Sequence, residues 1–299
     1  MRIDRGATGD RKARLRQTEP GWLQAILILL AFAAVAWIVL VPTAFVFYQA
    51  FGDGVRPFWR KVWEDPDTRH AIYLTVTVAP LAVVFNSIFG LAAAWAIARF
   101  EFRGKSLLLT LLDLPFAVSP VVAGLCFVLL FGMQGYFGPA LRDAGIKILF
   151  AWPALLIATM FVTMPFVVRE LIPLMEALGP EEEIAAVSLG ASGWQMFWRV
   201  TMPNIKWGLL FGAIQCNARA IGEFGAVYVV SGRIAGETDT MPLRVEKLFQ
   251  DSDNPGAFAL ASVLSLMALV TLLAKAFVER KAEKALEEQA EAQSRADAA

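Results

Sequence analysis

Four long runs of the sequence carry no charged side chain, and they constrain the fold more than any other feature. They cover residues 21–51, 71–98, 148–168 and 255–274. About 20 apolar residues are enough for a helix to cross the hydrocarbon core of a bilayer. Only helices and closed barrels satisfy their backbone in lipid, and these runs lack the alternation of barrel strands. The sequence therefore predicts an all-α integral membrane protein.

Two further apolar segments contain isolated charges, at 106–130 and at 207–230. Counting them gives a bundle of six transmembrane helices. The first is expected at 21–51, and the other five at about 71–99, 106–131, 149–171, 205–231 and 256–279, which together form one domain over 71–279. The composition agrees, because 57% of the residues are hydrophobic and only 18% are charged, against about a quarter charged in soluble domains.

The distribution of Lys and Arg predicts the orientation of this bundle. Basic residues are concentrated in the tail at 1–20 and in alternate loops, which places both termini, including the polar tail at 280–299, in the cytoplasm. The apolar run after the basic tail is too long for a signal peptide and is expected to stay as a helix. The 27 basic and 27 acidic residues balance, so nothing indicates nucleic-acid binding, and membrane lipid is the expected surroundings.

Residues that could carry chemistry are scarce. The chain has one histidine, His70, and two cysteines, Cys126 and Cys216, at spacings unlike those of metal sites. An intramembrane enzyme would need a nucleophile and a base close together, which this inventory does not offer. The segment "RGKS" ends like a nucleotide-binding P-loop, but Arg99 stands where the first glycine belongs. We expect no metal and no cofactor to be bound by this chain.

The loop at 176–204 is punctuated in a way that predicts two short helices meeting at a corner. Pro180 and the three glutamates after it favour the start of a helix. Gly190 allows the left-handed backbone that ends one, and Ser192 with Gln195 has the spacing of a capping box for the next. The predicted topology places this pair in the cytoplasm.

From the residues alone, this pair of helices has two interpretations. It is either a surface presented to a cytoplasmic partner or an elbow resting on lipid headgroups, with Trp194 and Trp198 as interfacial anchors.

The same loop resembles the "EAA" loop of the binding-protein-dependent ABC importer permeases, whose signature is E-A-A-x-x-x-G, nine residues and I-x-L-P. Ile184 stands at the signature glutamate, with Glu183 one place earlier, and Met202 replaces the usual Leu. The resemblance implies that the loop docks on a partner ATPase. The implied coupling residues are Glu183, Ala185, Ala186, Gly190, Ser192, Trp194 and Pro203.

The segments "LDLPFAVSPVVAG", "PFVVREL" and "NARAIGEFGAVYVVSG" extend the resemblance to the sulfate/thiosulfate permeases. It implies a type I ABC importer permease (MetI-like) fold in the inner membrane of a bacterium. The implied partners are a second homologous permease subunit in a heterodimer, two copies of a cytoplasmic ATPase that bind ATP-Mg, and a periplasmic sulfate-binding protein. Molybdate permeases have similar "GEFGA" segments, so molybdate or another oxyanion is the alternative substrate.

Arg219 and Glu223 are the most informative residues inside the predicted spans. An arginine at this depth costs about 2.5–3.5 kcal/mol to insert, so its side chain is expected to face protein or water. A spacing of four residues predicts an ion pair, which serves either helix packing or a translocation pathway or gate. Ser119 and Asn217 are further candidates for the pathway, while Asp113 is expected to cap the helix interruption near Pro115.

Overall fold

The computed structural model describes the backbone of residues 21–297 and the side chains of residues 21–281. All regular elements in this range are helical, as the sequence predicts. The chain divides into two units, Met1–Gln49 and Ala50–Ala299. The predicted basic tail at 1–20 lies outside the described residues, and the backbone of the predicted tail at 280–299 is helical as far as Asp297.

The first unit contains one apolar helix, in which α2 (Gly21–Val35), the π-helical turn η1 (Ala36–Leu40) and α3 (Val41–Ala50) follow without a break. The wider turn ends two residues before Pro42, whose missing N–H interrupts regular helical hydrogen bonding. The hydroxyl of Thr43 donates to the Val39 carbonyl at 2.7 Å and satisfies a group in this turn. The helix is 30 residues long, enough to cross a bilayer.

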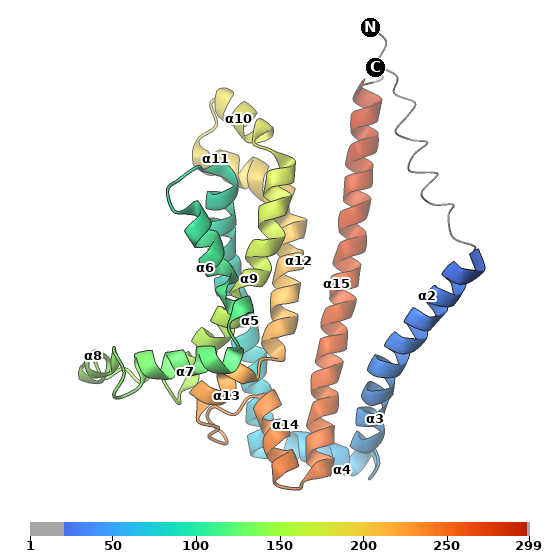
Figure 1. Cartoon of the computed structure of the whole chain (residues 1–299), viewed down its shortest axis with the longest axis vertical. Helices are drawn as coiled ribbons and strands as arrows, with labels where there is room; N and C mark the ends of the chain where they lie inside the picture. Colours follow the sequence, from blue (N-terminus) through green and yellow to red (C-terminus); the bar gives the residue numbers. More distant parts are fainter. Residues whose placement is uncertain (1–20, 298–299) are drawn as a thin grey trace. The chain divides into compact units, whose positions relative to one another are not determined.

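The second unit contains three long helices, α5 (Pro66–Arg99), α9 (Trp152–Leu178) and α15 (Asn254–Asp297), and many shorter ones (Figure 1). The shorter elements are α4 (Val55–Trp59), η2 (Arg60–Glu64), α6 (Lys105–Ala117), α7 (Pro120–Phe131), α8 (Gly138–Asp143), α10 (Glu181–Ser188), α11 (Gly193–Met196), η3 (Phe197–Thr201), α12 (Met202–Ile221), α13 (Gly225–Ser231) and α14 (Met241–Gln250).

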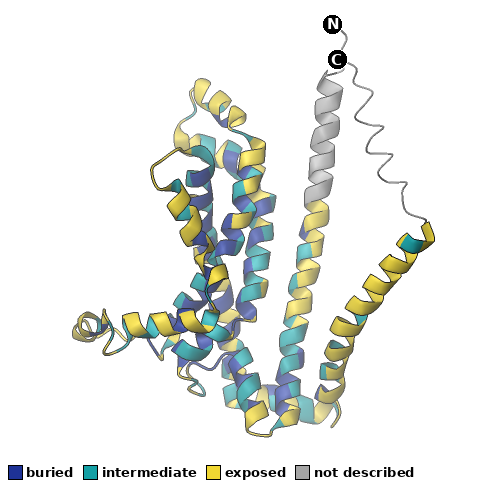
Figure 2. Cartoon of the chain, in the orientation of Figure 1, coloured by how far each residue is buried: buried dark blue, intermediate teal, exposed yellow. Residues whose placement is uncertain are grey.

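The core of this unit lies where α5, α9 and α12 pack together, and Figure 2 shows the buried residues concentrated on these helices. The side-chain nitrogen of Asn86 on α5 donates to the Met160 carbonyl at 3.1 Å and to the Thr163 hydroxyl at 2.9 Å, both on α9. The same nitrogen lies 3.7 Å from the Cys216 sulfur on α12. One buried amide therefore joins all three helices.

Glycines allow the three helices to approach closely. A Cβ atom on Gly90 of α5 would lie 2.8 Å from the Val167 side chain of α9, and one on Gly212 of α12 would lie 3.2 Å from the Val167 Cα. Gly208, one turn before Gly212, faces Leu174 in the same way. Small residues four positions apart are typical of tight helix packing in membranes.

Four helices are long and apolar enough to cross a membrane: Gly21–Ala50, Pro66–Arg99, Trp152–Leu178 and Asn254–Lys281. A fifth span is made if α6 and α7, which meet at a bend of 111°, are taken together. The single helix predicted at about 205–231 is divided into α12 and α13. The count of six helices and the cytoplasmic termini therefore stay predictions.

Both interruptions have local causes. Pro120 begins α7 and favours an extended backbone at Ser119, where ψ is 135°. Gly222, Glu223 and Phe224 separate α12 from α13. The two breaks face each other, because a Cβ atom on Gly225 would lie 2.9 Å from the Pro120 side chain.

We predict that Gly212→Leu lowers the melting temperature of the detergent-solubilised protein, because the new side chain would meet the backbone of α9. Overpacking of this kind costs about 1–3 kcal/mol. The control is Gly193→Leu, where a Cβ atom meets nothing within 4 Å. Equal melting temperatures for the two variants would contradict the close contact of α12 with α9.

Candidate functional site

The loop after α9 forms the predicted pair of short helices, at one end of the second unit (Figure 1). Gly190 has φ of 91°, in the left-handed region, and ends the first helix. The capping box is confirmed, since Ser192 Oγ accepts from the Gln195 N–H at 3.3 Å and Gln195 Oε1 accepts from the Ser192 N–H at 3.0 Å. The corner is therefore specified by local sequence.

The outer side of this corner is exposed, as Figure 2 shows for α10, and it carries large apolar side chains. We define the coupling face as Ile184, Val187, Leu189, Trp194 and Trp198, which are all exposed, Leu189 by 89%. Exposed apolar side chains grouped beside glutamates are typical of a protein–protein or membrane interaction site.

Most of the predicted coupling residues lie on or near this face. Ala185, Gly190, Ser192, Trp194 and Pro203 are exposed, Ala186 is half-buried and Glu183 is buried. The exception, Glu183, points into the protein.

The Glu183 carboxylate joins the short helices to the rest of the bundle. Arg99 Nε, at the end of α5, donates to Glu183 Oε2 at 2.8 Å, and its Nη2 donates to Oε1 at 3.3 Å. The hydroxyl of Thr201 in η3 donates to Oε1 at 2.8 Å. Sequence alone does not reveal Arg99 and Thr201 as partners of Glu183, because they lie 84 and 18 positions away and share no local pattern with it.

A cavity of about 400 Å³ lies beside the break between α6 and α7. The residues from Pro115 to Pro120 line it, together with Val162 and Phe166 of α9 and Arg219 of α12. The structure thus brings together Ser119 and Arg219, two of the predicted pathway residues. Non-helical backbone at membrane depth is tolerated where it lines a cavity, as it does here.

Glu223 lies behind Arg219, in the break between α12 and α13, and is 2% exposed. Its Oε1 accepts a hydrogen bond from the Ala226 N–H at 3.0 Å, which caps α13. Its Oε2 lies 2.7 Å from Arg219 Nη1, an ion pair whose angles are not those of a hydrogen bond. The predicted pair is therefore present, and Glu223 also holds the helix break.

The other two residues singled out in the spans lie elsewhere. Asn217 lines a separate cavity with Pro80, Met267 and Thr271. Asp113 does not cap a helix as expected, because Arg169 of α9 pairs with it at 2.8 Å.

Arg169 was missed by the sequence analysis, although a lone arginine near the end of a predicted span was a usable signal. Its guanidinium lies 4.3 Å from the centre of the Phe116 ring, within the range of a cation–π interaction.

The two cysteines do not meet, since Cys126 is exposed and Cys216 is buried beside Asn86. Within the described residues, no group of three His, Cys, Asp or Glu side chains is placed to hold a metal ion.

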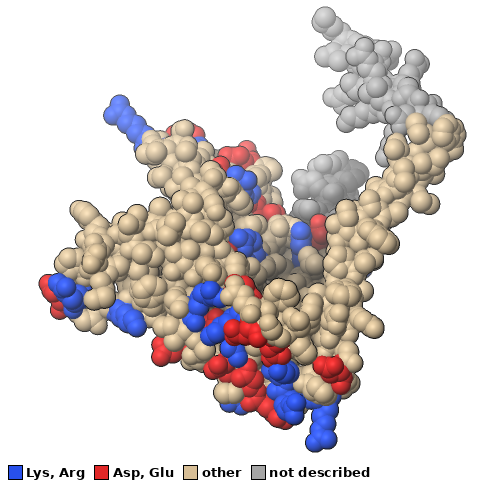
Figure 3. All heavy atoms as spheres, turned by 60° about the horizontal axis from the view of Figure 1, so that its bottom comes forward, with Lys and Arg blue, Asp and Glu red and all other residues tan. Residues whose placement is uncertain are grey.

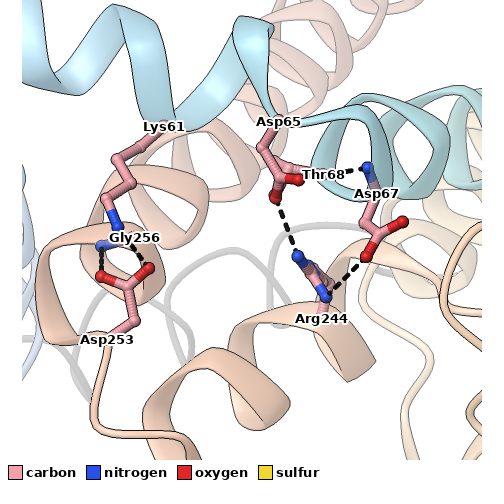
Figure 4. A network of polar contacts seen from close by, with 7 residues as sticks. All are labelled: Lys61, Asp65, Asp67, Thr68, Arg244, Asp253 and Gly256. Carbon is pink, nitrogen blue, oxygen red and sulfur yellow. Dashed lines mark hydrogen bonds and ion pairs between the residues drawn. The ribbon is translucent and has the colours of Figure 1, made fainter.

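At the end of the second unit that carries α14, acidic and basic side chains are interspersed (Figure 3). Arg244 of α14 donates to Asp65 at 2.8 Å and lies 3.5 Å from Asp67 (Figure 4). Lys61 pairs with Asp253 at 2.6 Å. These contacts connect η2 and the start of α5 to α14 and to the start of α15.

Within this network, the pKa of the Asp65 carboxyl is shifted by its neighbours. Burial alone would raise its pKa, but hydrogen bonds from Thr68 and Arg244 and the Arg244 charge outweigh that effect, so the pKa lies below its ordinary value.

Comparisons with known proteins agree with this architecture. Residues 86–284 match the family described as "Binding-protein-dependent transport system inner membrane component". A solved bacterial alginate ABC transporter in complex with an alginate pentasaccharide-bound periplasmic protein has the same fold in one of its chains. Its TM-score is 0.71 at 20% identity, covering 87% of this chain and 94% of that one.

The long apolar helices, the bent pair of α6 and α7 and the exposed helical corner are those of a permease subunit, and this chain belongs to the family of binding-protein-dependent transport system inner membrane components. Among individual proteins, it is 51% identical over 262 residues to the sulfate transport system permease protein CysW of Escherichia coli K12. That match covers 88% of this chain and 90% of CysW. It is 37% identical over 260 residues to CysT of the same organism, covering 86% of this chain and 92% of CysT.

We predict that Asp65→Asn destabilises the protein at neutral pH and that this effect fades in acid. Because the pKa of Asp65 is lowered in the folded state, its contribution is present above the ordinary carboxyl pKa and is lost as the pH falls through the folded value. The expected cost at pH 7 is about 1.5–3 kcal/mol, typical of a hydrogen bond to a charged group.

Thermal unfolding in detergent between pH 7 and about pH 2, which extends below the lowered pKa of Asp65, measures this effect, with the exposed Asp251→Asn as the control. A stability loss that is the same at every pH would contradict the role of the Asp65 charge.

Proposed function

We propose that this chain is the membrane-spanning subunit of an ATP-driven importer that carries sulfate and thiosulfate across the inner membrane of a bacterium. The observation that carries the proposal is the 51% identity to the sulfate permease CysW over 88% of the chain. The subunit itself forms the route for the anion, and ATP-Mg is bound and hydrolysed by a partner.

The relatives support the proposed partners. Similarity to both CysW and CysT supports a pair of unlike permease subunits, of which this chain is the CysW-like one. The alginate transporter was solved with a periplasmic protein, which supports a periplasmic binding protein that delivers sulfate. Two copies of a cytoplasmic ATPase complete the proposed complex, one for each permease.

The coupling face is the proposed contact with the ATPase. Its five exposed apolar side chains would be buried there, with Ile184 at the place of the signature glutamate. ATP-driven closure of the ATPase pair moves this corner and changes which side of the bundle is open. A partner shifts such an equilibrium only by binding the two states with different free energy.

Arg219, Ser119 and Glu223 are the proposed pathway or gate residues. A sulfate dianion loses its hydration in the bundle, and a guanidinium on the cavity wall offsets that cost through charge-assisted hydrogen bonds. The nearby Glu223 carboxylate repels the dianion and competes for Arg219, so binding stays weak enough for release. Asn217 belongs to a different cavity, so its place on the pathway remains a proposal from sequence alone.

Purification of the complex with its partner permease and ATPase, followed by reconstitution into vesicles, tests the function. Sulfate-loaded binding protein should stimulate ATP hydrolysis and uptake of labelled sulfate, and thiosulfate should compete. Stimulation by molybdate in place of sulfate would reassign the substrate to the alternative oxyanion. ATP hydrolysis by this chain alone would contradict the division of roles.

We predict that Arg219→Ala reduces sulfate uptake to background while the complex still assembles. The single substitution leaves the buried Glu223 without its partner. We therefore pair it with the double variant Arg219→Ala, Glu223→Gln, which removes the unpaired charge and keeps an acceptor for the Ala226 N–H.

Lys206→Ala, which removes an exposed cation from the same helix, is the control and should transport normally. Uptake at the wild-type rate by the double variant would exclude Arg219 from the pathway.

We predict that Leu189→Asp leaves the stability of the isolated subunit unchanged but releases the ATPase. Leu189 is 89% exposed in this chain, and in the proposed complex the ATPase buries it. Burying an unpaired carboxylate in an interface costs several kcal/mol, so copurification of the ATPase should fall by at least about tenfold.

Phe249→Asp, the same kind of change at an exposed position of α14, is the matched control and should keep the ATPase bound. Retention of the ATPase by Leu189→Asp would contradict the proposed docking face.

A further inference from the structure

Both ends of α5 hold the short helices that lie beyond the bundle. At the end near the coupling face, Arg99 binds the Glu183 carboxylate through two nitrogens, and its Nη1 donates to the Met175 carbonyl of α9 at 2.8 Å. The side chains of Arg99 and Glu183 are only 10% and 11% exposed. A planar guanidinium held by three hydrogen bonds fixes direction as well as distance, which a lysine could not reproduce.

An aromatic contact lies beside this ion pair. The rings of Trp95 on α5 and Phe197 in η3 meet edge to face, with 5.9 Å between their centres. Phe197 also contacts Trp194 and Trp198 of the coupling face, at 6.3 Å and 5.4 Å between ring centres. The coupling face is therefore joined to α5 by a polar link and an apolar link within one turn of helix.

At its other end, α5 holds α14 in a comparable way. Asp65, the residue that caps α5, accepts from Arg244, as Figure 4 shows. The hydroxyl of Thr75 accepts from the Met241 N–H at 2.9 Å and so satisfies one of the free backbone donors at the start of α14. Thr240, the residue directly before α14, caps the helix with no side-chain hydrogen bond.

Between these ends α5 is one helix of 34 residues, which continues through Pro80. At 1.5 Å per residue its length is about 50 Å. Since α5 packs along α9 and α12, it is supported over most of its length. A movement imposed on one end of such a helix reaches the other end because packed elements shift as rigid bodies.

We propose that Arg99 is a positioning residue that fastens the coupling corner to α5, and that α5 carries the displacement of that corner to α14 on the opposite side. This inference rests on the proposed function, since it assigns the route by which the ATPase opens the distant end. Glu183 acts here as the inward anchor of the corner, while the coupling face makes the outward contact. Arg99 touches neither the anion nor the ATPase.

The test compares Arg99→Gln with Arg99→Lys in the complete reconstituted complex. Arg99→Gln should keep the ATPase bound and hydrolysing ATP but should move about tenfold less sulfate for each ATP, a loss within the usual range of coupling between sites. Arg99→Lys should fall between wild type and Arg99→Gln, because lysine restores the charge and not the paired geometry. The control, Lys105→Gln, breaks an exposed ion pair with Glu101 near the same end of α5 and should behave as wild type.

The distant end is tested with a second matched pair on α5. Thr75→Val leaves the Met241 N–H without its acceptor and should lower the sulfate moved for each ATP, as Arg99→Gln does. Thr77→Val is the control, since the Thr77 hydroxyl bonds only within its own helix. Wild-type coupling in Arg99→Gln or in Thr75→Val would overturn the proposal, and so would loss of the ATPase from Arg99→Gln, which would make Arg99 a docking residue.

Hydrogen–deuterium exchange on the full chain in lipid nanodiscs tests the Arg99 anchor without any substrate. It therefore separates failure of the anchor from failure of the proposed function. Arg99→Gln should speed the exchange of α10 amides by about tenfold relative to Lys105→Gln, since local opening is governed by the contacts that hold an element. Unchanged exchange in α10 would overturn the anchor whatever the transported anion is. A complex whose wild type moves no sulfate, together with faster exchange in Arg99→Gln, would refute the substrate and keep the anchor.

Discussion

The close approach of α5, α9 and α12 is the constraint on which the rest of the second unit depends. In a bilayer, apolar burial does not favour helix over lipid, so packing and buried hydrogen bonds hold helices together. Here glycines on α5 and α12 remove the side chains that would separate them from Val167. Asn86 then supplies hydrogen bonds at the point where all three helices meet. The other helices are placed against this core.

Glycines also allow close packing at the two helix breaks, between α6 and α7 and between α12 and α13. Gly124 on α7 lies so close to α13 that a Cβ atom would meet the Ala226 carbonyl at 2.9 Å, and Gly225 approaches Pro120 in return. The breaks therefore support each other, and the cavity with Arg219 opens beside them. Interrupted helices at membrane depth are the usual way in which transporters expose polar groups to a substrate.

Charged pairs connect parts of the chain that are far apart in sequence. Arg99 with Glu183 holds the corner at one end, and Arg244 with Asp65 holds α14 at the other. The pair of Arg219 and Glu223 lies at the break between α12 and α13 and stabilises that break rather than a contact between distant helices. Each pair includes a side chain that is at most about 10% exposed, so removing its partner would leave a buried charge.

Much of this architecture can be predicted from short stretches of the sequence. Uncharged apolar runs of 20 or more residues predict spanning helices, because a helix satisfies its own backbone hydrogen bonds inside the bilayer. The corner between α10 and α11 also follows from its own residues, since Gly190 and the Ser192–Gln195 capping box act over a few positions. The pair of Arg219 and Glu223 was predictable for the same reason, being four residues apart.

What only the tertiary structure decided depends on which helices meet. The sequence presents Glu183 as one of three similar glutamates, and only the end of α5 makes it the buried one. The sequence around Asp113 predicts a local helix cap beside a proline, yet Asp113 forms an ion pair with Arg169 on another helix. Asn217 and Arg219 are two residues apart but line different cavities, because such positions lie about 200° apart around a helix. Local sequence sets where helices begin and end, whereas the choice of partner requires packing between distant segments.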